Sequence, residues 1–122
     1  MPFFKSLGYA LQGLQSCFYS EKNFRIQLSI ASITFFTGVV CGITRNEWLA
    51  VLFCTALVLG LEIINTAIEK LSNVFTTSVH PLIKQVKDIA ASAVLLASVI
   101  SLVTGCIIFI PRIILIIKNY YK

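Results

Sequence analysis

The chain has 122 residues, of which 57% are apolar and only 12% carry a charge. An ordinary soluble domain carries roughly 25% charged residues, and a chain this short has too much surface for its volume to keep so many apolar side chains out of water. These proportions exclude a disordered chain and argue against a soluble monomer. We therefore predict that residues 1–122 form a single domain that lies in a membrane.

The formal net charge is +5. The basic residues are scattered along the chain, which favours contact with anionic lipid headgroups over binding to nucleic acid. The acidic residues number only five, and they are Glu21, Glu47, Glu62, Glu69 and Asp88.

The first predicted element is an amphipathic helix over about residues 3–19. Its apolar residues recur at steps of three and four, as expected for one helix face, and they are Phe3, Leu7, Leu11, Leu14 and Phe18. Beside a bilayer such a helix either lies flat in the interface or packs on a helix bundle, and both alternatives stay open.

Three membrane spans are predicted next, over about residues 26–44, 48–71 and 88–110. A spanning helix needs about 20 mainly apolar residues, and the first and third stretches provide them directly. The second is uncharged only from residue 48 to 61, so it reaches spanning length only by continuing through Glu62 and Glu69. The predicted fold is an all-α integral membrane protein with a surface helix and three spans.

Lysine and arginine placement predicts the orientation. Cations precede the first span and follow the second, at Lys5, Lys22, Arg25, Lys70, Lys84 and Lys87, whereas the connection between the first two spans has only Arg45. The expected N-terminus is cytoplasmic, and three spans then place the C-terminus outside. Arg112, Lys118 and Lys122 run against this rule.

A polar stripe marks the second span. Glu62, Asn65, Glu69 and Asn73 fall within a sector of about 80° on a helix that turns 100° per residue. Ionisable groups in a span are costly and by default mark function. Carboxylate and amide oxygens suit Mg²⁺, which binds through one or two carboxylates together with substrate phosphates, and one carboxylate is left to act as a general base. The structural alternative is a polar clamp between helices.

The third span opens with Lys87 and Asp88, followed by small residues. Lysine contacts phosphate as a point charge, and an acid near a helix start is favoured by the helix dipole. The alternative is a capped helix with a snorkelling lysine. Before the first span, Glu21 and Arg25 stand at i and i+4, a spacing that predicts an ion pair on one helix face.

These blocks, in this order, resemble the prokaryotic diacylglycerol kinase family, which includes the undecaprenol kinases. The resemblance rests on residues 21–28 (EKNFRIQL), 62–69 (EIINTAIE) and 80–96 (HPLIKQVKDIAASAVLL). It implies a homotrimer in the bacterial cytoplasmic (inner) membrane. It also implies transfer of the γ-phosphoryl group of Mg-ATP to the hydroxyl group of a membrane lipid.

The resemblance also implies roles for single residues. Glu62 matches the proposed general base, and Glu21 and Glu69 match carboxylates that hold the divalent metal with the ATP phosphates. Asn65, Lys87 and Asp88 match residues that order the phosphates and the base.

The remaining implied contacts are with the nucleotide. His80 matches a histidine near it, and Tyr9 and Gly13 match positions on the adenine and ribose side. Asn73 stands where the family usually has Asp, and Gln12 where many relatives have Lys, so a weaker nucleotide or metal contact is expected there.

These blocks look more like those of the undecaprenol kinase branch of the family. The resemblance therefore favours undecaprenol as the substrate, with diacylglycerol as the alternative. Two other classes remain open on the residues alone. A small proton-coupled transporter would use Glu62 but leave Glu21, Lys87 and Asp88 unexplained. A non-catalytic interaction protein would use the stripe only for assembly.

Overall fold

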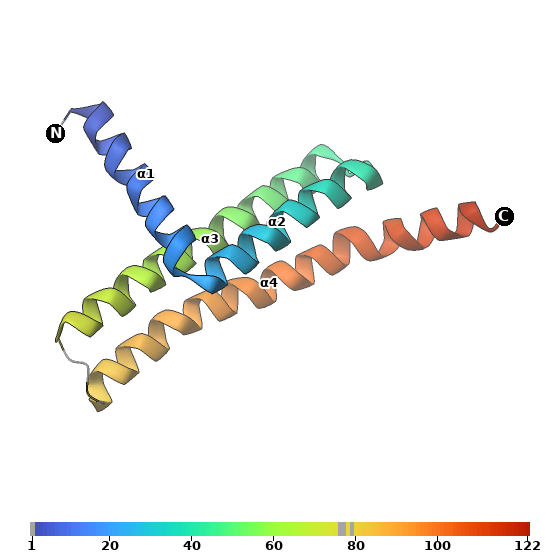
Figure 1. Ribbon diagram of the computed structural model, residues 1–122. Coiled ribbons are helices and arrows are strands. Elements are labelled where there is room, and N and C mark those ends of the chain that lie inside the picture. Colours follow the sequence, from blue (N-terminus) through green and yellow to red (C-terminus); the bar gives the residue numbers. More distant parts are fainter. Residues whose placement is uncertain (1, 76–77, 79) are drawn as a thin grey trace.

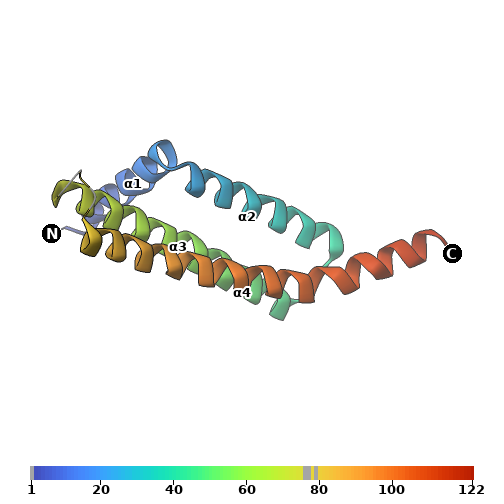
Figure 2. The ribbon, with the colours of Figure 1, turned by 90° about the horizontal axis from the view of Figure 1, so that it is seen from below.

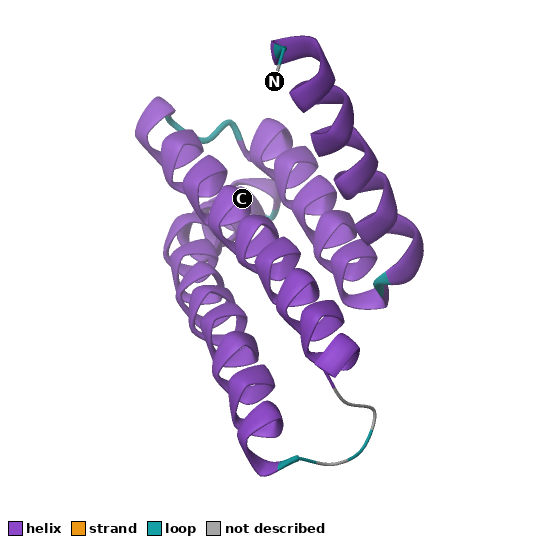
Figure 3. Cartoon of the chain, turned by 90° about the vertical axis from the view of Figure 1, so that its left-hand side faces the viewer, coloured by secondary structure: helices purple, strands orange, loops and turns teal. Residues whose placement is uncertain are grey.

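The computed structural model consists of four helices, and it describes residues 2–75, 78 and 80–122. The helices are α1 (Phe3–Ser20), α2 (Lys22–Cys41), α3 (Arg45–Phe75) and α4 (Pro81–Tyr120) (Figure 1). Within the described ranges there is no strand (Figure 3). The predicted all-α fold is confirmed.

Helices α2, α3 and α4 run side by side as a bundle, and α1 leaves it at an angle (Figures 1 and 2). Each of the three bundle helices is long and apolar enough to cross a bilayer, and its most apolar stretch of 18 residues has a mean hydropathy of 1.5 in α2, 2.1 in α3 and 2.7 in α4. Most of their large apolar side chains are exposed. A lipid environment suits this surface, because acyl chains are as apolar as the side chains they contact. The protein is a membrane protein.

The end of α2 is built around two glycines. Gly42 has a φ of 64°, in the left-handed region that glycine adopts without a steric cost, and it ends the helix. A Cβ atom on Gly38 would lie 2.8 Å from the Trp48 ring, so only glycine lets α2 approach the start of α3 so closely. The small buried cluster of Ile43, Val51 and Ile108 lies at this end of the bundle.

Helix α3 begins with a capping box. The backbone N–H of Glu47 donates to the Thr44 hydroxyl (3.3 Å), and the backbone N–H of Thr44 donates to the Glu47 carboxylate (2.9 Å). This reciprocal pair satisfies two N–H groups that the first turn of a helix leaves without partners. Glu47 thus helps to fix where α3 begins.

Arg112 of α4 closes the same end of the bundle. Its guanidinium forms an ion pair with the Glu47 carboxylate and donates a hydrogen bond to the Gly42 carbonyl oxygen (3.2 Å). We call Gly42, Glu47 and Arg112 the Arg112 clamp. The clamp accounts for one cation that ran against the charge rule, because Glu47 neutralises it locally.

Helix α4 is longer than the third predicted span. It begins at Pro81, where His80 caps it by accepting a hydrogen bond from the Leu82 backbone N–H at Nδ1 (3.2 Å). It then continues through Pro111 to Tyr120. The predicted span of about residues 88–110 followed the uncharged stretch between Asp88 and Arg112, and the helix itself extends past both of these charges.

Candidate active site

The polar stripe of α3 becomes more exposed toward the C-terminal end of the helix. Glu62 and Asn65 are buried, with 3% and 7% of their surface exposed. Glu69 is half-buried and Asn73 is exposed. The Asn65 amide N–H donates to the Glu69 carboxylate (3.4 Å), and the buried Asn65 carbonyl oxygen has no hydrogen-bond partner. The stripe therefore offers one accepting oxygen and two carboxylates to a ligand.

The acids of this region lack cationic partners. Within the described ranges the ion pairs are Lys84–Asp88 and Glu47–Arg112. Glu21 and Glu69 lie close enough to Glu62 for their charges to interact with it. Unneutralised negative charge in an apolar setting is costly, and a bound cation would remove that cost.

Helix α4 contributes a cation to the stripe. The Lys87 ammonium donates to the Asn73 side-chain oxygen at 2.7 Å, which joins the start of α4 to the end of α3. Asp88 points elsewhere, because its carboxylate pairs with Lys84 at 2.7 Å on a surface where both side chains are more than half exposed. The structure brings Lys87 to the stripe, while Asp88 lies exposed beside it.

Glu21 reaches the site from the turn between α1 and α2. Its backbone N–H caps the end of α1 by donating to the Cys17 carbonyl (2.9 Å), and its side chain is half-buried. The expected Glu21–Arg25 ion pair is not formed. Arg25 donates instead to the carbonyls of Phe18 (2.7 Å) and Tyr19 (3.1 Å), because the last carbonyls of a helix need donors. Glu21 is thereby left without a cation.

We call Glu21, Glu62, Asn65, Glu69, Asn73 and Lys87 the polar cluster. Four other residues implied by the resemblance lie outside it. Asp88 pairs with Lys84, and His80 serves as the cap of α4. Tyr9 is 59% exposed and Gly13 has open space around it, both on α1. The described contact between α1 and α3 side chains is near the end of α1, where Lys70 donates to Ser16 (3.3 Å) and Ser20 (3.4 Å).

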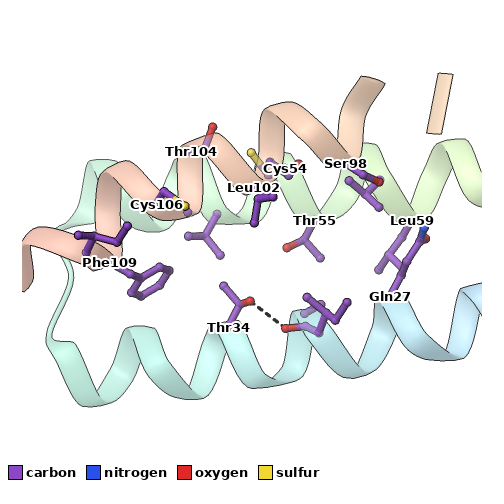
Figure 4. A pocket seen from close by; sticks show the side chains of 17 residues that line it. Gln27, Thr34, Cys54, Thr55, Leu59, Ser98, Leu102, Thr104, Cys106 and Phe109 are labelled. Atoms are coloured by element: carbon purple, nitrogen blue, oxygen red, sulfur yellow. Dashed lines mark hydrogen bonds between the residues drawn. The ribbon is translucent and has the colours of Figure 1, made fainter. Parts of the chain in front are cut away.

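Gln27 belongs with the site although its role was not expected from the sequence. Its side chain lies beside the Glu62 carboxyl group, and its carbonyl oxygen is buried without a partner. Gln27 also lines an apolar cavity of about 500 Å³ between α2, α3 and α4, at the end where Leu59 and Ser98 lie (Figure 4). The sequence feature that could have indicated this role is the amide side chain of Gln27 near the start of a predicted membrane span.

The described residues contain no group of three histidine, cysteine or acidic side chains close enough to hold one metal ion. Among these described residues, at most two carboxylates could therefore bind the same metal ion. Such a set still fits Mg²⁺, which typically takes one or two carboxylates and completes its shell with phosphate oxygens and water.

Comparison with known proteins identifies the class. The sequence profile described as prokaryotic diacylglycerol kinase matches residues 8–109. An undecaprenol kinase of Bacillus subtilis is 34% identical over 110 residues, which cover 90% of this chain and 89% of the relative. A diacylglycerol kinase of Haemophilus influenzae is 32% identical, with coverage of 85% and 89%. A diacylglycerol kinase of Escherichia coli is 30% identical, with coverage of 85% for both chains.

A helical membrane bundle with an unneutralised acidic cluster at one end, together with these matches, defines a membrane-bound lipid kinase. The chain belongs to the prokaryotic diacylglycerol kinase family. As a kinase it takes ATP as its co-substrate.

Proposed function

We propose that this protein transfers the γ-phosphoryl group of ATP to the hydroxyl group of undecaprenol, with diacylglycerol as the alternative acceptor. The observation that carries the proposal is the position of Glu62. Its buried carboxylate lies among unneutralised acids on one side and beside Gln27, which lines the apolar cavity, on the other. A lipid in this cavity would bring its terminal hydroxyl to a base that faces the nucleotide.

In the proposed reaction, Glu62 accepts the proton of the lipid hydroxyl. The hydroxyl oxygen forms a bond to the γ-phosphorus of ATP, the bond from that phosphorus to the β–γ bridging oxygen breaks, and ADP leaves. Phosphoryl transfer depends mainly on positioning and charge neutralisation. Lys87 is proposed to neutralise phosphate charge, and the Asn65 N–H bond to Glu69 to orient that carboxylate. Asp88, held beside Lys87, is proposed to help order the phosphates.

Glu21 and Glu69 are the residues proposed to hold Mg²⁺. Both present hard oxygen ligands, and neither forms an ion pair among the described contacts. The metal, when bound, would neutralise the charge of the ATP phosphates. Asn73 and His80 are proposed to contact the nucleotide.

Tyr9 and Gly13 support a proposal about assembly. They lie on α1, whose N-terminal part leads away from the bundle (Figure 1), and Tyr9 is exposed while Gly13 has open space around it. We propose that the protein is a homotrimer and that this part of α1 covers the ATP bound to a neighbouring subunit. Mixing two inactive variants, Glu62→Gln and Tyr9→Ala, during reconstitution should then restore part of the activity. A mixture that stays as inactive as the two separate variants would contradict active sites shared between subunits.

The proposed location is the bacterial cytoplasmic membrane, with the N-terminus and the polar cluster on the cytoplasmic side where ATP is available. A cysteine introduced at Ser6 should be shielded from a membrane-impermeant thiol reagent in intact cells and labelled after lysis. The four natural cysteines are first replaced by alanine or serine.

The substrate is tested by a direct comparison. The purified protein in mixed micelles receives labelled ATP and either undecaprenol or diacylglycerol at equal surface concentration. The favoured outcome is a higher kcat/KM for undecaprenol, as the name of the Bacillus subtilis relative suggests. A higher kcat/KM for diacylglycerol selects the alternative acceptor, and transfer to neither lipid rejects both.

A further inference from the structure

Helix α4 is longer than one crossing of a bilayer requires. Its 40 residues correspond to about 60 Å at 1.5 Å per residue, against about 30 Å of hydrocarbon in a membrane. Residues 89–111 alone cover about 35 Å between the end that carries Asp88 and the end that carries Arg112. The C-terminal part of α4 extends beyond the ends of α2 and α3 (Figures 1 and 2).

This extension is apolar on every side. Residues 113–117 are five consecutive aliphatic residues, IILII, and each of them is between 42% and 60% exposed. At 100° per residue they cover a full turn of the helix, so no polar face is available to meet water. Moving one such side chain out of water is worth about 1.5–3 kcal/mol, which makes an aqueous position for the whole run unfavourable.

The residues around the run suit the boundary between lipid headgroups and acyl chains. Tyr120 and Tyr121 are 82% and 80% exposed, and tyrosine is enriched at this boundary. Lys118 and Lys122 follow the run, and no acidic residue occurs after Asp88 in the sequence. The positive charge of this end therefore complements an anionic lipid surface.

Two features determine where the extension begins. The Arg112 clamp holds α4 against the turn between α2 and α3. Pro111, directly before it, lies inside the helix and lacks the N–H that would otherwise bond to the Ile107 carbonyl, which is a common cause of a helix bend. The segment also lies outside residues 8–109, the part matched by the family profile.

We propose that residues 112–122 are a lipid anchor that lies in the membrane interface at the end of the bundle opposite the polar cluster. In the structure α4 continues through Pro111 as one helix, and in the bilayer the missing N–H at Pro111 would let the segment bend toward the plane of the membrane. The aliphatic run enters the acyl region, while the lysines and tyrosines stay among anionic headgroups. Such an anchor would hold α4 at a constant depth and so keep Lys87 at its own interface.

The test measures the depth of tryptophan in vesicles of phosphatidylcholine and phosphatidylglycerol. Trp48 is the single tryptophan of the chain and lies beside Glu47, so the natural protein reports the depth of the Arg112 clamp. A second protein combines Trp48→Phe with Leu115→Trp and reports the depth of the extension. Acyl chains carry bromine either near the headgroup or near the chain end.

Because an interfacial helix lies about 5–10 Å into the headgroup–acyl boundary, shallow bromine should quench both proteins about twofold more than deep bromine. No quenching at position 115 would place the extension in water and overturn the proposal. Stronger quenching of Trp48 by deep bromine would overturn it in favour of one long tilted span. Quenching at 115 that disappears at a high protein-to-lipid ratio would show a second copy on this surface, and it would also overturn the proposal.

A separate variant tests whether the lysines of the extension bind anionic lipid. In a protein with Trp48→Phe and Leu115→Trp, the further changes Lys118→Gln and Lys122→Gln should abolish the increase in shallow quenching that phosphatidylglycerol produces. An unchanged response to phosphatidylglycerol would contradict recognition of anionic lipid. Circular dichroism of each variant verifies the fold. Kinase activity is not the readout, so failure of the anchor proposal and failure of the proposed function are distinguishable.

Discussion

The two ends of the helix bundle differ in whether their acidic side chains have partners among the described residues. At one end, Glu47 forms an ion pair with Arg112 and a capping box with Thr44. At the other, Glu62 and Glu69 form no ion pair among the described contacts, and the Asn65 carbonyl oxygen has no partner. The same residue type therefore stabilises the fold where its contacts are complete, and it offers chemistry where they are not.

The sharpest way to test this contrast is to make the same substitution at both ends. Glu62→Gln should lower kcat about 10²–10⁴-fold, the usual contribution of a general base, because an amide cannot accept the lipid proton. The thermal midpoint of unfolding in detergent should change little. The measurement is steady-state transfer of labelled phosphate, and near-normal turnover would sink the assignment of Glu62 as the base.

Glu69→Gln should change how strongly the activity depends on the Mg²⁺ concentration. Removing one of two proposed carboxylate ligands should raise the Mg²⁺ concentration for half-maximal activity about 10–100-fold, by analogy with other changes at metal sites. Activity at saturating Mg²⁺ should recover in part, and removal of Mg²⁺ by a chelator should stop both proteins. An unchanged Mg²⁺ dependence would remove Glu69 from the proposed ligand set.

Gln27→Leu tests the link between the cavity and the base. The substitution keeps the volume but removes the amide beside Glu62, so kcat/KM for the lipid should fall about tenfold, equivalent to about 1.4 kcal/mol. The KM for ATP should stay the same, which separates positioning of the lipid and its base from a general loss of structure. Equal effects on both substrates would argue against this role.

Glu47→Gln is the matched control at the opposite end. It removes the charge that pairs with Arg112, whereas a glutamine oxygen can still accept the Thr44 N–H of the capping box, so the thermal midpoint of unfolding should fall slightly. Activity measured well below the thermal midpoint should be unchanged. A large drop in kcat with an unaltered thermal midpoint would mean that the two ends are not functionally separate.

Asn73→Asp should give the smallest effect. Asn73 already accepts the Lys87 hydrogen bond at 2.7 Å, so the aspartate adds a charge to an exposed contact, and exposed ion pairs are worth about 0–1 kcal/mol. The KM for ATP should change by less than about fivefold, the equivalent of that energy. A larger change would mean that the charge at residue 73 acts on the metal or the phosphates and not only through Lys87.

Much of the fold follows from the sequence because lipid imposes strict rules. Long apolar runs must be helices in a bilayer, and the period of Glu62, Asn65 and Glu69 places them on one face. The length of α4 did not follow, because charged residues mark the ends of an apolar stretch but do not end a helix. How much of each helix lies within the membrane stays a prediction.

The site was less accessible to sequence reasoning where partners lie far apart in the chain. Arg112 and Glu47 are separated by 65 positions, and no local pattern joins them. Arg25 was expected to pair with Glu21 by spacing, but the carbonyls at the end of α1 compete for its guanidinium. Gln27 becomes informative only when α2 and α3 are seen side by side.

The Arg112 clamp also has a consequence for biosynthesis. Ribosomes make chains from the N-terminus, so Glu47 and the α2–α3 turn emerge before the residue that neutralises them. During that interval the α2–α3 hairpin carries an acid whose cationic partner does not yet exist. Completion of α4 supplies it, and a chain that stops before residue 112 keeps this end of the hairpin unclosed.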